Sequence, residues 1–323
     1  MKLSPEDQAK RDASIQAREI DADRAAAEQA IMRLPKGDLL LRYQQRVVDK
    51  LFAGAAVIYV EKSRRIGLTW GVAAFSSLKA ASASSAGGQN VWYMGYDKDM
   101  TLEFIEVCAM WARAFGLVAG ECQEEEVLYI DENGKEQGVK AFSIRFASGF
   151  RITALASVPR ALRGKQGIVI IDEAAFHNDV QEVIDSAMAL LMWGGQVVII
   201  STHFGVENAF NLAIEEVRAG TRKGDVVTIT FMDAIADGLA ERTALVKKTR
   251  GLPVPTKEEF IADTYGYYGE AAAQELDCVP KTRAPLSNCC PIGSALRASP
   301  IPAPARPMKC PSDRWRCTRR SPA

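Results

Sequence analysis

The sequence predicts an α/β protein with a mostly parallel sheet that carries helices on both faces. From Ala55 onward, short apolar segments of strand character alternate with segments whose apolar residues recur at helical spacing. One strand-like segment, 167–176 (GIVIIDEAAF), holds an apolar run of the kind that is buried on both faces of a sheet. Strands that alternate with helices require crossover connections, and these give a parallel sheet covered on both sides.

The expected elements follow one another along the chain. Residues 1–34 are expected to form a charged N-terminal helix, because 4–32 are rich in Ala, Glu, Gln, Arg and Asp. A second helix is expected within 35–54, where apolar residues recur at helical spacing. A hairpin is expected over 127–146, with Asn133-Gly134 as a turn pair that tolerates positive φ. The other expected strands are 55–60, 90–96, 149–156, 167–176, 195–202 and 225–231, and the other expected helices are 69–82, 100–115, 180–192 and 208–219.

The composition is average for a soluble globular protein, with 48% hydrophobic and 25% charged residues. The net charge is zero, but residues 281–323 carry nine Lys/Arg and a single acid, which leaves 31 basic and 39 acidic residues in 1–280. The body is therefore acidic, which excludes a globally basic surface for nucleic acid. Any DNA contact would come from a local patch or a partner.

Several classes of site and location are disfavoured. The seven cysteines show no repeated CxxC pair, and their number is odd, so reduced thiols are expected rather than a zinc site or a disulfide framework. His177 and His203 are the only histidines, and neither has a second His or Cys at metal-ligand spacing. The sequence shows no run of about 18 apolar residues and no secretory signal, so neither a membrane span nor secretion is expected.

Residues 61–70 (EKSRRIGLTW) have the position of a phosphate-binding loop, between an expected strand and an expected helix. In the pattern GxxxxGK[ST], Lys62 replaces the first Gly and Leu68 replaces the Lys. Gly67 and the helix that begins near Leu68 would provide the turn and the backbone N–H groups that bind phosphate. Thr69 would supply a hydroxyl for a metal ion.

The cation that contacts the phosphates is expected to come from earlier in the loop, where Lys62, Arg64 and Arg65 are close enough to reach back. Taken alone, the loop is a weak signal. A basic turn before a helix explains it as well.

A second motif strengthens the interpretation. Asp172 and Glu173 follow the apolar run Ile168–Ile171, and the carboxyl end of a strand in a parallel sheet is where ligands bind. Asp172 is expected to hold Mg²⁺, and Glu173 to orient or deprotonate the attacking water. A strand that ends in solvated acids is the alternative, and the loop about 105 residues earlier makes it less favoured.

Three further motifs are candidates with equally ordinary alternatives. Ser201 and Thr202 end the next expected strand and could sense the γ-phosphate, or simply cap a helix. Arg160 and Arg163 lie in a basic loop that suits an arginine finger or a DNA phosphate contact, or a solvated turn. The pair Tyr43-Gln44 could stack on and hydrogen-bond an adenine, or belong to an amphipathic helix.

Together the motifs resemble the ATPase half of tailed-phage large terminases, and most closely the Mu-like family. The resemblance covers roughly 35–280 and rests on the order and spacing of KSRRIGLTW, RALRGKQG, IVIIDEAAF, STHF and YQQ. It implies a P-loop NTPase-type sheet, with ATP and Mg²⁺ as cofactors, Arg64 and Glu173 as catalytic residues, Thr69 and Asp172 as metal ligands, and Ser201 and Thr202 as coupling residues. The implied nucleotide-binding residues are Tyr43, Gln44, Lys62, Ser63, Arg65, Ile66, Gly67, Leu68 and Thr69.

The resemblance also implies a function and partners. The chain would be an ATP-hydrolysing motor in the cytoplasm of the host bacterium that packages double-stranded DNA, working with a portal protein, a small terminase subunit and other copies in a ring. The alternatives are a non-catalytic prophage remnant that binds nucleotide or partners, and a helicase-like nucleic-acid ATPase.

One departure from the family concerns the nuclease domain that its chains also contain. We expect an ATPase domain over 35–235, a helical linker over 236–280 and a disordered tail over 281–323, with a frameshift as one explanation of the tail. The tail holds nine of the 14 prolines when Pro280 is included, and its only acid is Asp313. Several carboxylates are needed to bind catalytic metals, so no nuclease activity is expected from this chain.

Overall fold

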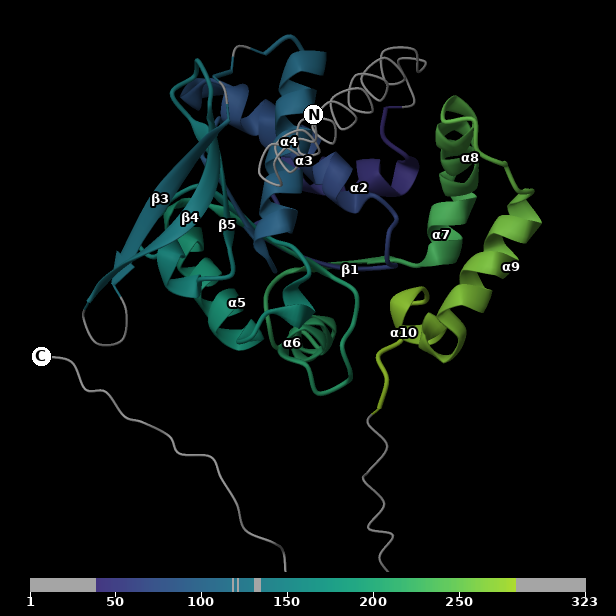
Figure 1. Cartoon of the computed structure of the whole chain (residues 1–323). Coiled ribbons are helices and arrows are strands. Elements are labelled where there is room, and N and C mark those ends of the chain that lie inside the picture. Colours follow the sequence, from purple (N-terminus) through teal and green to yellow (C-terminus); the bar gives the residue numbers. More distant parts are fainter. Residues whose placement is uncertain (1–38, 118, 121, 131–134, 283–323) are drawn as a thin grey trace, which may run out of the picture. The chain divides into compact units, whose positions relative to one another are not determined.

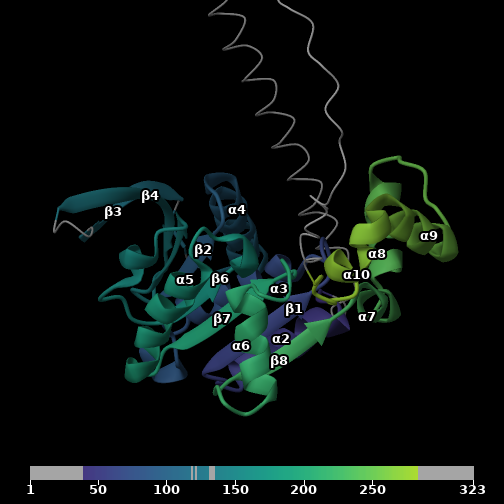
Figure 2. The same cartoon turned by 90° about the horizontal axis from the view of Figure 1, so that it is seen from below.

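A computed structural model describes residues 39–117, 119–120, 122–130 and 135–282. The expected N-terminal helix, the turn pair Asn133-Gly134 and the tail from 283 onward lie outside the described residues. Within them, the chain forms an eight-stranded sheet in the order β3-β4-β5-β2-β6-β7-β1-β8 (Figures 1 and 2). The strands are β1 Val57–Lys62, β2 Val91–Gly95, β3 Gln123–Ile130, β4 Glu136–Arg145, β5 Arg151–Ala156, β6 Ile168–Ile171, β7 Gln196–Ser201 and β8 Asp225–Ile229.

The predicted mostly parallel sheet is confirmed. Strands β5, β2, β6, β7, β1 and β8 run parallel to one another, and only the β3–β4–β5 pairings are antiparallel. The antiparallel part contains the expected hairpin, in which Gln123 pairs with Ser143 and Ile130 pairs with Glu136. The helices are α2 Arg42–Phe52, α3 Leu68–Ala81, α4 Lys98–Ala114, α5 Val180–Met188, α6 Ala209–Arg218, α7 Phe231–Ala236, α8 Leu239–Thr249, α9 Lys257–Tyr268 and α10 Ala272–Glu275.

Helices cover both faces of the sheet because every central strand is apolar on both sides. In β1, Ile58 and Val60 pack in a cluster with α2, α3 and α4, whereas Val57 and Tyr59 pack in a second cluster with α5 and α6. This alternation follows from successive strand residues pointing to opposite faces. Figure 1 shows α2, α3 and α4 above the sheet and α5 and α6 below it.

Several expected boundaries were wrong: the strand expected over 167–176 ends at Ile171 and is followed by a 3₁₀ turn over Ala174–Phe176, and the first strand of the hairpin begins at Gln123 instead of residue 127. Two others have a clear local cause. The helix expected over 180–192 ends as an α-helix at Met188 and continues as a 3₁₀ turn to Trp193, where Gly194 adopts φ 75° and stops it. The strand expected over 225–231 ends at Ile229 because Thr230 caps α7, with its hydroxyl accepting a hydrogen bond from the Asp233 amide at 3.1 Å.

Residues 236–280, expected to be helical, are helical in α8, α9 and α10. With α7 these helices form a separate small cluster at the end of β8 (Figure 2). The buried members of this cluster are Phe231, Ile235, Ala240, Ala272 and Leu276. Whether the segment links to another domain stays a prediction. In the part of the chain that the structure describes, no helix combines the length and hydropathy needed to cross a bilayer.

Candidate functional site

The phosphate-loop candidate, residues 62–69, connects the carboxyl end of β1 to the start of α3. Arg65 (φ 59°) and Gly67 (φ 69°) both adopt the left-handed conformation, so the loop turns sharply twice before the helix begins at Leu68. Gly67 meets this demand without strain. The strand order β6-β7-β1 then places the loop beside the ends of the two strands that carry the other predicted motifs.

The loop is supported from beneath by α2. The hydroxyl of Tyr43 donates to the carbonyl of Ile66, and the amide of Gln44 donates to the carbonyl of Gly67 at 2.7 Å. Both side chains are buried, and burial raises the pKa of Tyr43 above its ordinary value. Tyr43 would have to leave this position to stack on an adenine. The adenine contact stays a prediction, whereas the observed contacts hold the loop.

The acidic turn after β6 is in direct contact with the loop. The hydroxyl of Thr69 donates to Oδ2 of Asp172 at 2.9 Å, and the hydroxyl of Tyr93 on β2 donates to the same oxygen at 3.1 Å. Glu173 adopts the left-handed conformation (φ 50°), and its amide donates to Oδ1 of Asp172 at 3.0 Å. Thr69 and Asp172, which are 103 positions apart in the sequence, are thus joined by a hydrogen bond. Their role as metal ligands stays a prediction.

His177 holds this turn from behind. Its Nε2 lies 3.0 Å from the carbonyl oxygen of Asp172, and its Nδ1 lies 2.6 Å from the hydroxyl of Ser157. Because a carbonyl only accepts, Nε2 carries the proton and Nδ1 accepts from Ser157. Burial lowers the pKa of His177, which is consistent with this neutral form.

Lys62 and Glu173 form an ion pair at the centre of the site, with Nζ 3.0 Å from Oε1. The Lys62 side chain is 6% exposed, whereas that of Glu173 is 26% exposed. A buried ammonium therefore lies between the loop and the residue expected to act on water. Either partner would be able to turn toward a phosphate or a water molecule that entered from the open side of Glu173.

The donor set at Thr69 and Asp172 suits a magnesium ion. Burial and the neighbouring Glu173 raise the pKa of Asp172 more than Lys62 and Thr69 lower it, so additional positive charge at this carboxylate would be stabilising. Mg²⁺ commonly takes one or two protein oxygens together with phosphates and water. Thr69 and Asp172 would supply two such oxygens. No group of three or more His, Cys, Asp or Glu suited to a metal occurs among the described residues.

The predicted coupling residues lie at the same edge of the sheet. Ser201, the last residue of β7, accepts a hydrogen bond from the amide of Ala175 at 3.1 Å, so it contacts the acidic turn. Thr202 is buried beside it. A direct contact of either residue with a phosphate stays a prediction.

The four predicted arginines lie in three different surroundings. Arg64 contacts α10, with Nη1 3.2 Å from Oε2 of Glu275 and its amide 2.8 Å from the carbonyl of Glu275. Arg65 is exposed. The structure places Arg160 and Arg163 beside α5, where Arg160 contacts Glu182 and Arg163 lines a groove of about 870 Å³. An arginine-finger or DNA role for these two stays a prediction.

Sequence reasoning missed four residues that shape the site: Tyr93, His177, Glu61 and Glu275. Glu61 had a signal, since it is an acid inside the apolar strand VIYVEK. Tyr93 and His177 lie close to strand ends at the ligand edge, but only the strand order brings them to Asp172. Glu275 had no signal, because its contact spans 211 residues.

Comparison with known proteins identifies two curated relatives. The chain is 47% identical over 248 residues to the Mu-like prophage FluMu protein gp28 of Haemophilus influenzae, a match that covers 75% of this chain and 46% of that protein. It is 42% identical over 249 residues to the probable terminase, large subunit gp28, of Escherichia phage Mu, covering 75% and 44%. The predicted resemblance is confirmed at this identity. The chain spans less than half the length of these relatives.

The other comparisons add less. No family model matches the chain. Among solved structures, an ATPase-domain mutant of the Thermus phage P74-26 large terminase matches with a TM-score of 0.46 and 13% identity, covering 78% of this chain and 97% of that one.

Proposed function

We propose that this chain hydrolyses ATP to drive phage double-stranded DNA into a prohead. Its similarity over 248 residues to a Mu-like prophage gp28 protein, and over 249 residues to the probable terminase large subunit of phage Mu, supports the proposal. One observation carries the proposal. The hydrogen bond from Thr69 to Asp172 and the ion pair of Lys62 with Glu173 join the phosphate-loop candidate to the acidic turn.

The residues have distinct proposed roles. The amides at the start of α3 and the side chain of Lys62 bind the phosphates. Arg64 or Arg65 supplies positive charge near the phosphate oxygens on which negative charge develops in the transition state. Thr69 and Asp172 hold Mg²⁺, which neutralises charge on the β- and γ-phosphates when it is bound. Glu173 orients or deprotonates the attacking water.

The ion pair suggests how nucleotide binding activates Glu173. In the structure Nζ of Lys62 lies 3.0 Å from this carboxylate and neutralises it. A γ-phosphate carries more negative charge than a single carboxylate, so Lys62 turns toward it when ATP binds. Glu173 is then released to accept a hydrogen bond from water, and hydrolysis starts only in the loaded site.

The wider assignment rests on the relatives. We place the protein in the cytoplasm of the host bacterium, with double-stranded DNA, a portal protein, a small terminase subunit and other copies of the large subunit as its partners. Ser201 and Thr202 transmit loss of the γ-phosphate, and Arg160 and Arg163 contact either DNA or a neighbouring subunit. Nuclease activity is not assigned to this chain.

The test is Mg²⁺-dependent ATP hydrolysis by the purified chain, with and without linear duplex DNA. Glu173→Ala is expected to lower turnover by roughly 10²-fold, because it removes the general base. Glu258→Ala, which removes an exposed carboxylate from the first turn of α9, is the matched control and is expected to behave like the wild type. Nucleotide binding without turnover in the wild type would contradict the proposal and favour the remnant.

A further inference from the structure

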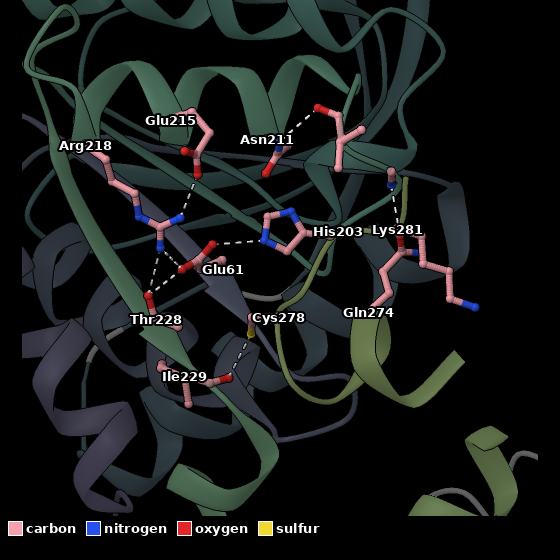
Figure 3. A network of polar contacts seen from close by, with 12 residues as sticks. Glu61, His203, Asn211, Glu215, Arg218, Thr228, Ile229, Gln274, Cys278 and Lys281 are labelled. Atoms are coloured by element: carbon pink, nitrogen blue, oxygen red, sulfur yellow. Dashed lines mark hydrogen bonds and ion pairs between the residues drawn. The ribbon is translucent and has the colours of Figure 1, made fainter. Parts of the chain in front are cut away.

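A buried polar network lies behind the predicted site, at the junction of β1, β7 and β8 (Figure 3). Its centre is Glu61, which is 1% exposed and immediately precedes the phosphate-loop candidate. One carboxylate oxygen accepts a hydrogen bond from Nε2 of His203 at 2.9 Å. The other accepts from Arg218, at the end of α6, and from Thr228 on β8.

The carboxylate is held in its charged form. Burial acts to raise the pKa of Glu61, but the hydrogen bonds from His203 and Thr228 and the charge of Arg218 outweigh it, so the pKa lies below its ordinary value. Arg218 reaches solvent, with 43% of its side chain exposed, whereas His203 is fully buried. The contact between Glu61 and His203 is therefore the part of the network that lies wholly inside the protein.

The contact between His203 and Glu61 connects the end of β7 to the phosphate-loop candidate. Ser201, Thr202 and His203 are consecutive, and Ser201 accepts from the amide of Ala175, just after Glu173. Two residues later, His203 contacts Glu61, the residue before Lys62. The end of β7 therefore contacts the acidic turn on one side and the base of the phosphate loop on the other. In the sheet, Glu61 is also the register partner of Ser201.

The second ring nitrogen of His203 is unusual. Nε2 lies against a carboxylate, whereas Nδ1 is buried and has no hydrogen-bond partner among the residues that the structure describes. Buried polar atoms in folded proteins are nearly always satisfied. The side chain is also held in place by the ring of Phe210, with centroids 5.6 Å apart. His203 is therefore held in a fully buried position between the carboxylate of Glu61 and the ring of Phe210.

We propose that His203 and Glu61 are positioning residues that hold the phosphate loop in register with the acidic turn. They extend the coupling motif from Ser201 and Thr202 to a third residue, and they connect it to the strand that carries Lys62. The inference deepens the proposed ATPase function and rests on it. It predicts that loss of the His203 donor misplaces Lys62 relative to Glu173, and with it the γ-phosphate.

The test compares two substitutions at the same position. His203→Leu removes the donor to Glu61, whereas His203→Gln keeps an N–H near the position of Nε2. We expect the leucine variant to lose about 10- to 100-fold in ATP turnover, because displacements of about 1 Å have effects of this size. The glutamine variant should stay within about threefold of the wild type. Glu61→Gln, a nearly isosteric change, should follow the leucine variant in direction.

Binding of a fluorescent ATP analogue and the thermal midpoint are measured on the same samples. The control is Thr153→Val, which removes a buried hydrogen bond to Ser143 on strands that carry none of the motifs. A purely structural role predicts lower midpoints for all variants, with equal turnover per folded molecule. That result, or wild-type turnover in His203→Leu, would overturn the inference.

Failure of the two proposals can be told apart. Nucleotide binding without turnover in the wild type would sink the ATPase proposal alone, and the inference would then be judged on the analogue's affinity. There His203→Leu should bind at least about tenfold more weakly than His203→Gln. If the wild type binds no nucleotide, both proposals fall together.

Discussion

At the scale of single residues, the site contains two carboxylates that are buried instead of exposed to solvent. Glu61 and Asp172 are both almost fully buried carboxylates, but they differ in their neighbours. Each accepts hydrogen bonds from three groups, but one donor to Glu61 is the charged Arg218 and the pKa of Glu61 is lowered, whereas Asp172 lies beside Glu173 and its pKa is raised. The charge of Glu61 is already stabilised by groups within the protein. Asp172 is a site that positive charge would stabilise, which is why we assign the metal to it and a positioning role to Glu61.

A pH-dependent stability follows from Glu61. A carboxyl whose pKa is lowered in the folded state stabilises that state above its unfolded pKa of about 4.3, and this stabilisation is lost as the pH falls through the folded pKa. Glu61→Gln should therefore reduce the free energy of unfolding by about 1–3 kcal/mol at pH 7. The difference from the wild type should shrink below about pH 4. Urea denaturation at several pH values measures both.

The matched control for this prediction is Glu215→Gln. Glu215 also contacts Arg218, at 2.9 Å, but its side chain is 58% exposed. Exposed ion pairs contribute about 0–1 kcal/mol, so the control should change stability little at any pH. A Glu61→Gln deficit that stayed constant from pH 7 to pH 3.5 would contradict the assignment of a charged Glu61.

At the scale of elements, α10 contacts the phosphate-loop candidate from a position far along the chain. Its Glu275 accepts from the Arg64 amide through its carbonyl and from the Arg64 guanidinium through its carboxylate. The next residue, Leu276, accepts from the amide of Phe231 at 2.8 Å and is fully buried. A short helix far along the chain thus determines where Arg64 points in this structure.

Release of Arg64 is therefore expected to favour nucleotide binding. Glu275→Gln removes the charge that holds the guanidinium, which is about half exposed, so the ion pair contributes no more than about 1 kcal/mol. Affinity for a fluorescent ATP analogue should rise by up to about fivefold, with little change in stability. Glu270→Gln, an exposed acid just before α10, is the control. Weaker binding in Glu275→Gln would mean that α10 supports the site.

At the scale of the described molecule, stability is distributed unevenly. Two large apolar clusters cover the faces of the sheet, whereas α7–α10 share a small cluster with five buried members. α8 contributes one buried residue, Ala240, and α9 contributes none. Regions with few buried contacts open locally at lower free energy than the core.

Hydrogen exchange followed by mass spectrometry tests this difference. Peptides from β1, β6 and β7 should exchange only near the rate of global unfolding, and peptides from α8 and α9 should exchange at least about tenfold faster, which corresponds to about 1.4 kcal/mol. Peptides from α3 serve as the internal control, because α3 is also a helix but most of its residues are buried against the sheet. Equal protection of α9 and β7 would show that the two parts unfold together.

The sequence by itself determined the fold class, the order of the elements and the two main motifs. A short β-branched run such as Ile168–Ile171 is typical of a buried strand. The two motifs, a strand followed by Gly67 and a helix and a strand followed by two acids, are each contained in a few consecutive residues. Local patterns are readable because propensity and hydrophobic spacing act over a few residues. The same reasoning named Lys62, Thr69, Asp172 and Glu173, which the structure brings into contact.

Only the tertiary structure decided which partners these residues have. The strand order places β6 next to β7 and β7 next to β1, and that order depends on packing over the whole sheet. Tertiary packing joins Tyr93 to Asp172, His203 to Glu61 and Arg64 to Glu275, across separations of 79, 142 and 211 residues. It also buries Tyr43 under the loop instead of leaving its ring exposed. Such contacts have no local signature, because they depend on where distant elements pack and not on the residues beside them.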